Sequence, residues 1–308
     1  MIDNILNRLI DIGQQNNVNI LYAVESGSRG WNVASADSDW DVRFIYRRPL
    51  EAYTALWPRR DVIEVMDKEA NIDMVGWDVI KALRLAASNN PSIIEWLHAK
   101  EPYLEQSFRW PESPETVCLW NEELSGIMKD FSERHLAHHY LSLLSRQYKA
   151  YFLPEDAPVR LKKYVYALRP ALCVHWMLDH AGEHRVPPMD FRQLLAECKI
   201  QLSQLYTKAW WSDFEGEILC WLDKKAKGTE KESYGRYPAM DRFISGYVGK
   251  TMHEVVSNHL PTSVPDRKKL EKFFRDTIYS YFVAGIGSIF MTEVSEDNLL
   301  VEKKKETG

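Results

Sequence analysis

The 308-residue sequence predicts an α+β protein, in which an N-terminal mixed sheet with helices is followed by an α-helical C-terminal domain. Up to about residue 100, short apolar runs alternate with turn-forming residues, which is typical of strands. Beyond that point the apolar residues recur at the three- and four-residue spacing of helices. The composition, 45% hydrophobic and 27% charged, is that of a globular chain with an ample core.

Four strands are expected in the N-terminal part. An amphipathic helix within residues 1–20 leads to the apolar run 19–25, NILYAVE, which predicts a buried strand. The run 40–46, WDVRFIY, alternates like a second strand, parallel or antiparallel to the first. Two further strands are predicted at 62–66 and 71–77. Helices are expected at 49–56, from Asp78 and from Pro91, because proline is favourable in the first turn of a helix.

The rest of the chain predicts mostly helices. They are expected at 114–131, 132–152, 160–180, 201–226 and 266–282. A polar segment containing glycine and proline, 227–241, predicts a flexible loop. We therefore expect a first domain at 1–102, an α-helical domain at 103–290 and a flexible tail at 291–308.

Charge and hydropathy exclude some classes of protein. A net charge of −5 and a pI near 6.0 argue against a protein that coats nucleic acid non-specifically. No apolar stretch approaches the roughly 20 residues that cross a bilayer, and the N-terminus lacks the pattern of a signal peptide. The four cysteines form no C-x-x-C motif and predict buried free thiols. We expect a cytoplasmic protein with no membrane partner, and no pattern predicts its oligomeric state.

Three aspartates are candidates for a metal site. Asp39 and Asp41 stand two residues apart at the start of a predicted strand, so they share one of its faces. Like charges that close raise each other's pKa unless a cation neutralises them, and carboxylate oxygens suit Mg²⁺ or Mn²⁺. Asp73 lies between apolar residues of a later strand, where an acid needs a partner. Glu64, also in a predicted strand, is the rival third acid.

A glycine and a serine precede these acids. Gly27 and Ser28 follow the predicted strand 19–25. Glycine there lets the backbone approach a phosphate closely, and the serine hydroxyl can donate a hydrogen bond to it. Alone, Asp39 and Asp41 are more typical of a turn. Together with Gly27-Ser28 and with Asp73 on a following strand, they favour a metal-dependent site.

These blocks resemble the nucleotidyltransferase signature of the DNA polymerase β superfamily: a Gly-Ser turn, a D-x-D strand and a third acid on a neighbouring strand. The segments ESGSRGW, SADSDWDVRFIY, IDMVGWDVIKALRLAASNNPSIIEWL and LKKYVYALRP resemble the RNA-ligase-associated polymerase-β-like nucleotidyltransferases in particular. Two positions depart from that pattern. Asn32 stands where a glycine is expected, and Ile80 stands where a basic residue is commoner.

The resemblance implies a nucleotidyltransferase-type sheet and a two-metal mechanism. In that mechanism Asp39, Asp41 and Asp73 would hold Mg²⁺ or Mn²⁺, and a nucleoside triphosphate would be the donor. In-line attack of a hydroxyl on the α-phosphate would release pyrophosphate. The association of the family with RNA ligases implies an RNA end under repair as the acceptor. The alternatives are transfer to a small molecule or a protein side chain, and a non-catalytic nucleotide-binding or antitoxin-like module.

Four basic residues are candidates for contacts with the triphosphate. Lys162 and Lys163 belong to a locally basic stretch, 142–175, and to the family-like block LKKY. Arg29 directly follows Gly27-Ser28, and Lys81 comes shortly after the strand of the third acid. Such side chains could hold phosphate oxygens. The competing interpretation of the lysines is a solvated helix face.

Histidines and aromatic residues elsewhere favour structural roles. His135, His138 and His139 recur at helical spacing, but no further ligand of matching spacing accompanies them, so surface histidines are favoured over a metal site. Tyr166 lies near the basic block, where packing is favoured over stacking on a nucleobase.

Overall fold

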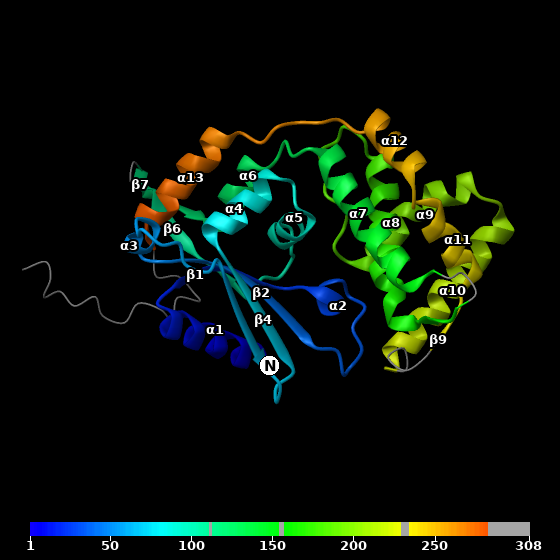
Figure 1. The fold of residues 1–308 in the computed structure, drawn as a ribbon, viewed down its shortest axis with the longest axis horizontal. Helices are drawn as coiled ribbons and strands as arrows, with labels where there is room; N and C mark the ends of the chain where they lie inside the picture. The colour runs from blue at the N-terminus through cyan, green and yellow to red at the C-terminus, as the bar shows by residue number, and fades with distance from the viewer. Residues whose placement is uncertain (111–112, 154–156, 229–233, 283–308) are drawn as a thin grey trace, which may run out of the picture.

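A computed structural model describes residues 1–110, 113–153, 157–228 and 234–282, which form a sheet-containing part and a helical part (Figure 1). A five-stranded sheet in the order β3-β4-β2-β1-β5 is the centre of the first part. Its strands are β1 (Asn19–Glu25), β2 (Trp40–Arg47), β3 (Val62–Asp67), β4 (Ile72–Asp78) and β5 (Leu104–Glu105). β2 and β4 are parallel and the other pairs antiparallel, which confirms the predicted mixed sheet.

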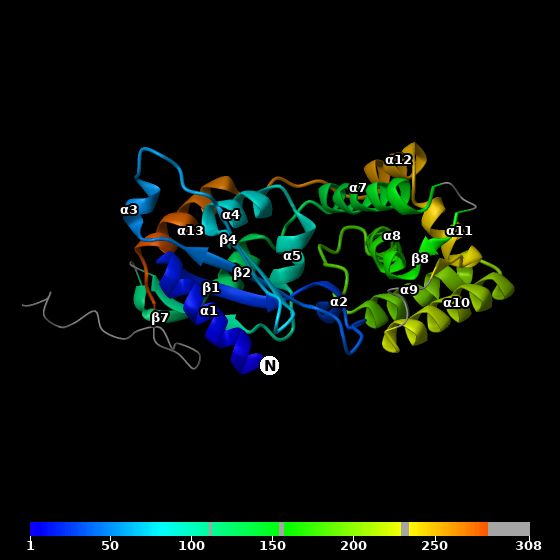
Figure 2. The ribbon, with the colours of Figure 1, turned by 60° about the horizontal axis from the view of Figure 1, so that its bottom comes forward.

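One face of the sheet is covered by α1 (Ile2–Asn16) (Figure 2). The apolar positions of α1 recur at helical spacing and pack with the alternate strand residues that point to this side, Val42 and Phe44 among them. Because successive strand residues face opposite sides, Asp41 and Arg43 point to the other face. The burial of α1 therefore fixes the direction in which the acids of β2 point.

The opposite face carries α4 (Val79–Ala87), α5 (Pro91–Leu97) and α6 (Trp120–Ile127). Asp78 caps α4 by accepting a hydrogen bond from the backbone N–H of Ile80, and Asn90 caps α5 in the same way at Ser92. α13 (Arg267–Tyr279) returns from the far end of the chain to pack against α4 and α6 (Figure 1). Two short helices, α2 (Gly27–Gly30) and α3 (Leu50–Tyr53), follow β1 and β2.

The helical part confirms the predicted fold class. Its helices are α7 (Glu133–Tyr151), α8 (Tyr164–Asp179), α9 (Phe191–Leu205), α10 (Lys208–Ala226), α11 (Pro238–Gly246) and α12 (Lys250–His259). A short ribbon of β8 (Val159–Arg160) and β9 (Tyr234–Gly235) leads into a 3₁₀ turn, Leu161–Lys163, before α8. One apolar core runs without interruption from α4 and α5 into α7, α8 and α10. None of the described helices is both long and apolar enough to cross a membrane.

Several elements differ from the prediction. The helix expected at 114–131 is a strand, β7 (Ser113–Leu119), followed by α6. β7 pairs with β6 (Ser107–Trp110), which also pairs with β10 (Tyr281–Phe282), so strand pairing overrides the helical spacing. The helix expected at 201–226 is broken before Thr207, whose hydroxyl caps α10.

Further differences concern the loop, the cysteines and the domains. The segment 227–241 holds β9 and the start of α11, although residues 229–233 lie outside the description, as does the tail 291–308. Cys173 and Cys198 are buried free thiols, but Cys220 is exposed on α10. The division at residue 102 stays a prediction, and β5, which joins the central sheet, lies just beyond it.

Candidate active site

The three predicted acids meet at one end of the central sheet. Asp41 of β2 lies directly opposite Asp73 of β4 in the parallel pair, so both side chains share a face. Asp39 is exposed, immediately before β2, and lies on the same side as Asp41. Glu64, the rival third acid, lies opposite Val75 on the edge strand β3 and pairs with Arg60 instead.

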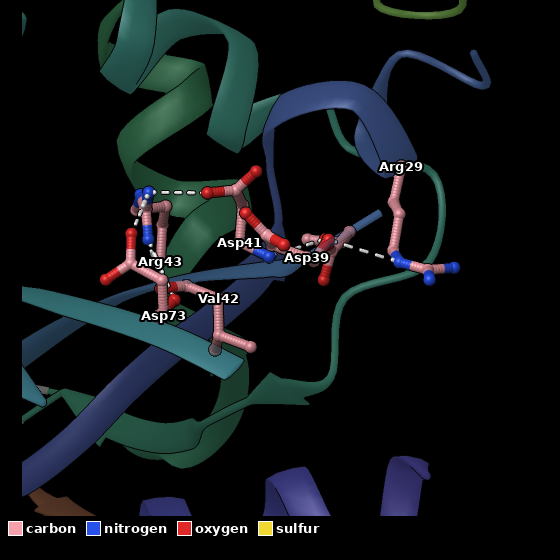
Figure 3. A network of polar contacts seen from close by, with 7 residues as sticks. Arg29, Asp39, Asp41, Val42, Arg43 and Asp73 are labelled. Atoms are coloured by element: carbon pink, nitrogen blue, oxygen red, sulfur yellow. Dashed lines mark hydrogen bonds and ion pairs between the residues drawn. The ribbon is translucent and has the colours of Figure 1, made fainter. Parts of the chain in front are cut away.

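Arg43 joins two of these acids and was not predicted from the sequence. Its Nη2 lies 3.0 Å from Oδ1 of Asp41 and 2.9 Å from Oδ2 of Asp73 (Figure 3). Its Nη1 donates to the backbone carbonyls of Val42, at 3.0 Å, and Asp73, at 2.9 Å. The guanidinium is therefore fixed to the backbone of both strands. The available signal was the two-residue spacing of Asp39, Asp41 and Arg43, which places them on one face.

The acids experience each other's charge. Burial raises the pKa of Asp41, the Arg43 guanidinium opposes that rise, and the charges of Asp73 and Asp39 add to it. Lys162 is close enough to lower the pKa of Asp41 as well. Asp41 therefore lies in a cluster whose negative charge one arginine only partly neutralises, which is the environment that a divalent cation stabilises.

Gly27 is required by the shape of the site. Its φ of +58° lies in the left-handed region, and a β-carbon added there would lie 2.0 Å from Oδ2 of Asp41. The turn is fixed to β2, because Ser26 N–H donates to the Asp41 carbonyl and Asp41 N–H donates to Oε1 of Glu25, both at 2.9 Å. Burial raises the pKa of Glu25, which also accepts a hydrogen bond from Tyr103. Glu25 thus holds the backbone of Asp41 in place through the Asp41 N–H.

Ser28 and Arg29 differ in how they are engaged. The Ser28 hydroxyl makes no hydrogen bond to any residue that the structure describes. Arg29 donates from Nη2 to the Ser38 carbonyl at 2.7 Å and from Nε to the Asp39 carbonyl at 3.2 Å (Figure 3). Its guanidinium also lies 4.0 Å from the centre of the Trp40 ring. Arg29 therefore holds the loop that carries Asp39.

Asn32 adopts the conformation for which a glycine was expected. Its φ of +55° is left-handed, and asparagine tolerates this region better than most residues do. Its side-chain amide donates to Oδ2 of Asp190 at 2.9 Å, just before α9. The backbone N–H of Phe191 donates to the Trp31 carbonyl at 2.9 Å. The substitution thus preserves the turn and links α2 to the helical part.

The start of α8 faces the acids from the helical part. The positive charge of Lys162, in the 3₁₀ turn, lowers the pKa of Asp41. Burial raises the pKa of Tyr166, and the charges of Asp41 and Asp39 raise it further, so its hydroxyl lies within range of the charges of both acids. Lys163 is directed to aromatic rings, with Nζ 4.3 Å from the ring centre of Tyr151. Tyr166 was expected to be a packing residue, and it does pack, partly buried, against the core and edge to face with Trp31 at 5.8 Å between ring centres.

Lys81 lies away from these groups. It is on α4, beyond the far end of β4 from Asp73, and its Nζ lies 3.3 Å from Oδ1 of Asp61. The five steps from Asp73 to Asp78 span about 17 Å at 3.3 Å per residue. The structure therefore brings together Gly27, Ser28, Asp39, Asp41, Asp73 and Lys162, but not Lys81.

The donor set suits a magnesium or manganese ion by its chemistry. Among the described residues, no three histidine, cysteine or carboxylate side chains lie close enough together to hold an ion unaided. Magnesium sites in nucleotide enzymes do not need such a cage, because one or two carboxylates are completed by substrate phosphates and water. Asp39 and Asp41 offer carboxylates of that kind, and because burial raises the pKa of Asp41, a bound cation would stabilise its ionised form.

A mixed sheet with three aspartates at one end, against which a Gly-Ser turn packs, places the chain in the polymerase-β-like class of proteins. The comparison of sequences is more specific. The chain belongs to the RNA repair pathway DNA polymerase beta family (RlaP), whose model matches residues 1–276. It is also similar to "Uncharacterized protein YcgL" of Bacillus subtilis (strain 168). The two are 32% identical over 253 residues, which is 82% of this chain and 87% of the relative.

Proposed function

We propose that the protein is a divalent-metal-dependent nucleotidyltransferase. It moves a nucleoside monophosphate from a nucleoside triphosphate to a hydroxyl group and releases pyrophosphate. The observation that carries this proposal is the position of Asp41 beside Asp73 on neighbouring parallel strands, with Gly27 packed against the Asp41 carboxylate. Membership of a polymerase β family supports the same chemistry.

The acids are assigned by their position. Asp39 and Asp41 would hold Mg²⁺ or Mn²⁺, and Asp73 would complete the set next to the attacking hydroxyl. A bound divalent ion lowers the pKa of a hydroxyl and neutralises the triphosphate. Arg43 keeps one oxygen of Asp41 and one of Asp73 engaged, so the other oxygen of each carboxylate is left for the ion. Arg43 is therefore a positioning residue in this proposal.

The donor would lie between the Gly27-Ser28 turn and the start of α8. The unengaged Ser28 hydroxyl is suited to donate to a phosphate oxygen, and Lys162 supplies a positive charge on the opposite side. Tyr166, near the acids, is suited to contact the ribose or the base. During transfer the acceptor oxygen bonds to the α-phosphorus, while the bond from that phosphorus to the β-phosphate oxygen breaks.

We propose an RNA end under repair as the acceptor, and the description of the family as an RNA repair pathway supports this. Transfer to a small molecule or to a protein side chain is the alternative, and the same assay separates the two. A non-catalytic nucleotide-binding module is less well supported. Such a module has no need of Asp41 and Asp73, whose like charges lie side by side.

The test is an incubation of the chain with each labelled nucleoside triphosphate, Mg²⁺ or Mn²⁺, and a panel of RNA ends, transfer RNA, proteins and small hydroxyl compounds. Wild type is compared with Asp41→Asn and with Glu64→Gln, a matched control on the edge strand. We expect label transfer and pyrophosphate release that need Asp41 and do not need Glu64. Label on a protein or small molecule selects the alternative acceptor. Transfer that persists in Asp41→Asn contradicts the proposed site.

A further inference from the structure

A second groove lies at the other end of the sheet-containing part. Two neighbouring hollows of about 350 and 610 Å³ share Ile80 and Arg84 of α4. The smaller one lies between α4 and the segment that follows α3, and the larger lies between α4 and α13, which Figure 1 shows beside each other. Along β2, the distance from Asp41 to Arg48 is about 23 Å at 3.3 Å per residue. The groove is therefore separate from the acid cluster.

The groove is lined by three arginines whose guanidinium groups are exposed and unpaired among the described residues. Arg59, Arg84 and Arg267 are exposed, and their guanidinium groups make no hydrogen bond or ion pair with any residue that the structure describes. They follow one another along the groove, since Arg59 lines the smaller hollow, Arg267 the larger, and Arg84 both. The other charges nearby are largely paired, Arg48 with Asp78, Arg60 with Glu64 and Lys81 with Asp61. One exposed acid, Glu271, also lines the larger hollow, where Arg84 and Arg267 outnumber it. On a chain of net charge −5, this row of free guanidinium groups marks a local site for an anion.

Aromatic side chains are interleaved with these arginines. Tyr53 lines the smaller hollow and Phe274 the larger, and their rings meet edge to face with centres 5.6 Å apart. Trp57 does not itself line a hollow, but in the chain it lies between Ala55 and Pro58 of the smaller one, and 79% of its surface is exposed, next to Leu56 at 84%. A tryptophan so exposed forfeits the burial that normally stabilises it, so it points to a ligand with a flat apolar face.

We infer that this groove binds a single-stranded segment of RNA, with the phosphates on the arginines and bases stacked on Trp57 and the neighbouring rings. Free positive charges alternating with aromatic faces are the features that hold single strands without reading sequence. A duplex hides its bases in the stack and offers no face to Trp57. This inference rests on the proposed function, because it assigns a place for the body of the acceptor at a distance from its reacting end.

The experiment measures binding of a fluorescent single-stranded RNA of about 12 nucleotides by anisotropy, without nucleoside triphosphate and over a range of salt concentrations. Arg84→Ala should weaken binding and reduce the slope of log K against log salt by about 0.7, the share of one phosphate contact. Trp57→Ala should weaken binding about tenfold and leave that slope unchanged, because stacking releases no counterions. Arg242→Ala, an exposed arginine of α11, is the matched control and should bind like wild type.

The outcomes separate this inference from the proposed function. Asp41→Asn should bind the RNA like wild type, since the acids lie at the other end of the sheet. RNA binding that is kept in Asp41→Asn and weakened in Arg84→Ala and Trp57→Ala, with no nucleotide transfer by wild type, would leave the groove supported and the proposed chemistry rejected. Binding that is lost in Asp41→Asn but kept in Arg84→Ala and Trp57→Ala overturns the groove, as does equal affinity for duplex RNA. Absence of any RNA binding, with a protein partner found instead, overturns it too.

Discussion

The α-carbon of Gly27 packs against the carboxylate of Asp41, and a β-carbon there would lie 2.0 Å from Oδ2. Gly27→Ala should therefore push Asp41 out of place, and the φ of +58° adds strain. We expect at least a hundredfold loss of pyrophosphate release, of the order that a misplacement of about 1 Å causes. Gly216→Ala in α10 is the control, because nothing lies within 4 Å of that position. Equal activity of both variants would show that the position of Asp41 is not critical.

Asp41→Asn separates stability from activity. Burial raises the pKa of Asp41, so the folded protein binds a proton there more readily than the unfolded chain does. The ionised carboxylate thus destabilises the fold at neutral pH, and the amide should raise the melting temperature at pH 7 in the absence of metal. The gain should shrink as the pH falls toward about 3.9, the ordinary pKa of an aspartate. Melting curves across this range, with chelator present, test the sign. A lower melting temperature for the variant at pH 7 contradicts it.

Arg43 should matter most when no metal is bound. Its guanidinium is the cation that touches both Asp41 and Asp73. Arg43→Gln should lower the melting temperature in chelator, and added Mn²⁺ should raise it by more than it does for wild type, because the ion then relieves an unshielded repulsion. Arg43→Lys retains the charge but lacks the planar guanidinium that bonds to both acids. We expect a loss of activity of about 10- to 100-fold, which is typical when a residue that orients a metal ligand is removed. Identical Mn²⁺ effects on wild type and Arg43→Gln would argue against this role.

The sheet was predictable because its strands are short apolar runs whose alternation survives in the fold. The runs 19–25 and 40–46 became β1 and β2, and the two-residue spacing of Asp39 and Asp41 already placed both on one face. The sequence could not show that Asp41 lies directly opposite Asp73, because that depends on which strands become neighbours and in which register they pair. The first part of the helix expected at 114–131 became β7 for the same reason, since its partner β6 lies earlier in the chain, whereas residues 120–127 are helical as expected.

The positions of the basic residues relative to the acids were harder to predict. Residues that are close in sequence can lie at opposite ends of the sheet when a strand separates them. Lys81 follows Asp73 closely in the chain, yet β4 carries it to the opposite end of the sheet. Arg29 follows Ser28, but its guanidinium is engaged with the carbonyls of the Asp39 loop. Lys162 reaches Asp41 only because the helical part packs across the end of the sheet, which no local pattern encodes.

Lys162 and Lys81 offer a direct test of the triphosphate contact. Lys162→Ala should raise the KM for the nucleoside triphosphate by about tenfold or more, the value of a charge-assisted hydrogen bond, with a smaller change in kcat. Because Lys162 lowers the pKa of Asp41, its loss should also move the acidic limb of the pH–rate profile to higher pH. Lys81→Ala should leave both quantities unchanged, since Lys81 pairs with Asp61. Equal effects of the two substitutions would contradict the assignment.

His138 and His253 should make the helical part sensitive to acid. Nδ1 of His138 on α7 lies 2.9 Å from Nδ1 of His253 on α12, so one ring must donate and the other accept, which two protonated rings cannot do. Burial lowers the pKa of His138, and the charge of His253 lowers it further. The folded protein therefore binds fewer protons there than the unfolded chain, and this contribution to stability is lost as the pH falls below about 6.5.

The variant His138→Gln tests that linkage. It cannot take up a proton, so its stability should fall less than that of wild type between pH 7 and pH 5, although glutamine makes it less stable than wild type at pH 7. His135→Gln is the control, because His135 is exposed on the same helix and makes no hydrogen bond from its ring to any described residue. Urea unfolding at several pH values gives the free energies. If His138→Gln and His135→Gln show the same pH dependence as wild type, the pair between α7 and α12 does not govern acid stability.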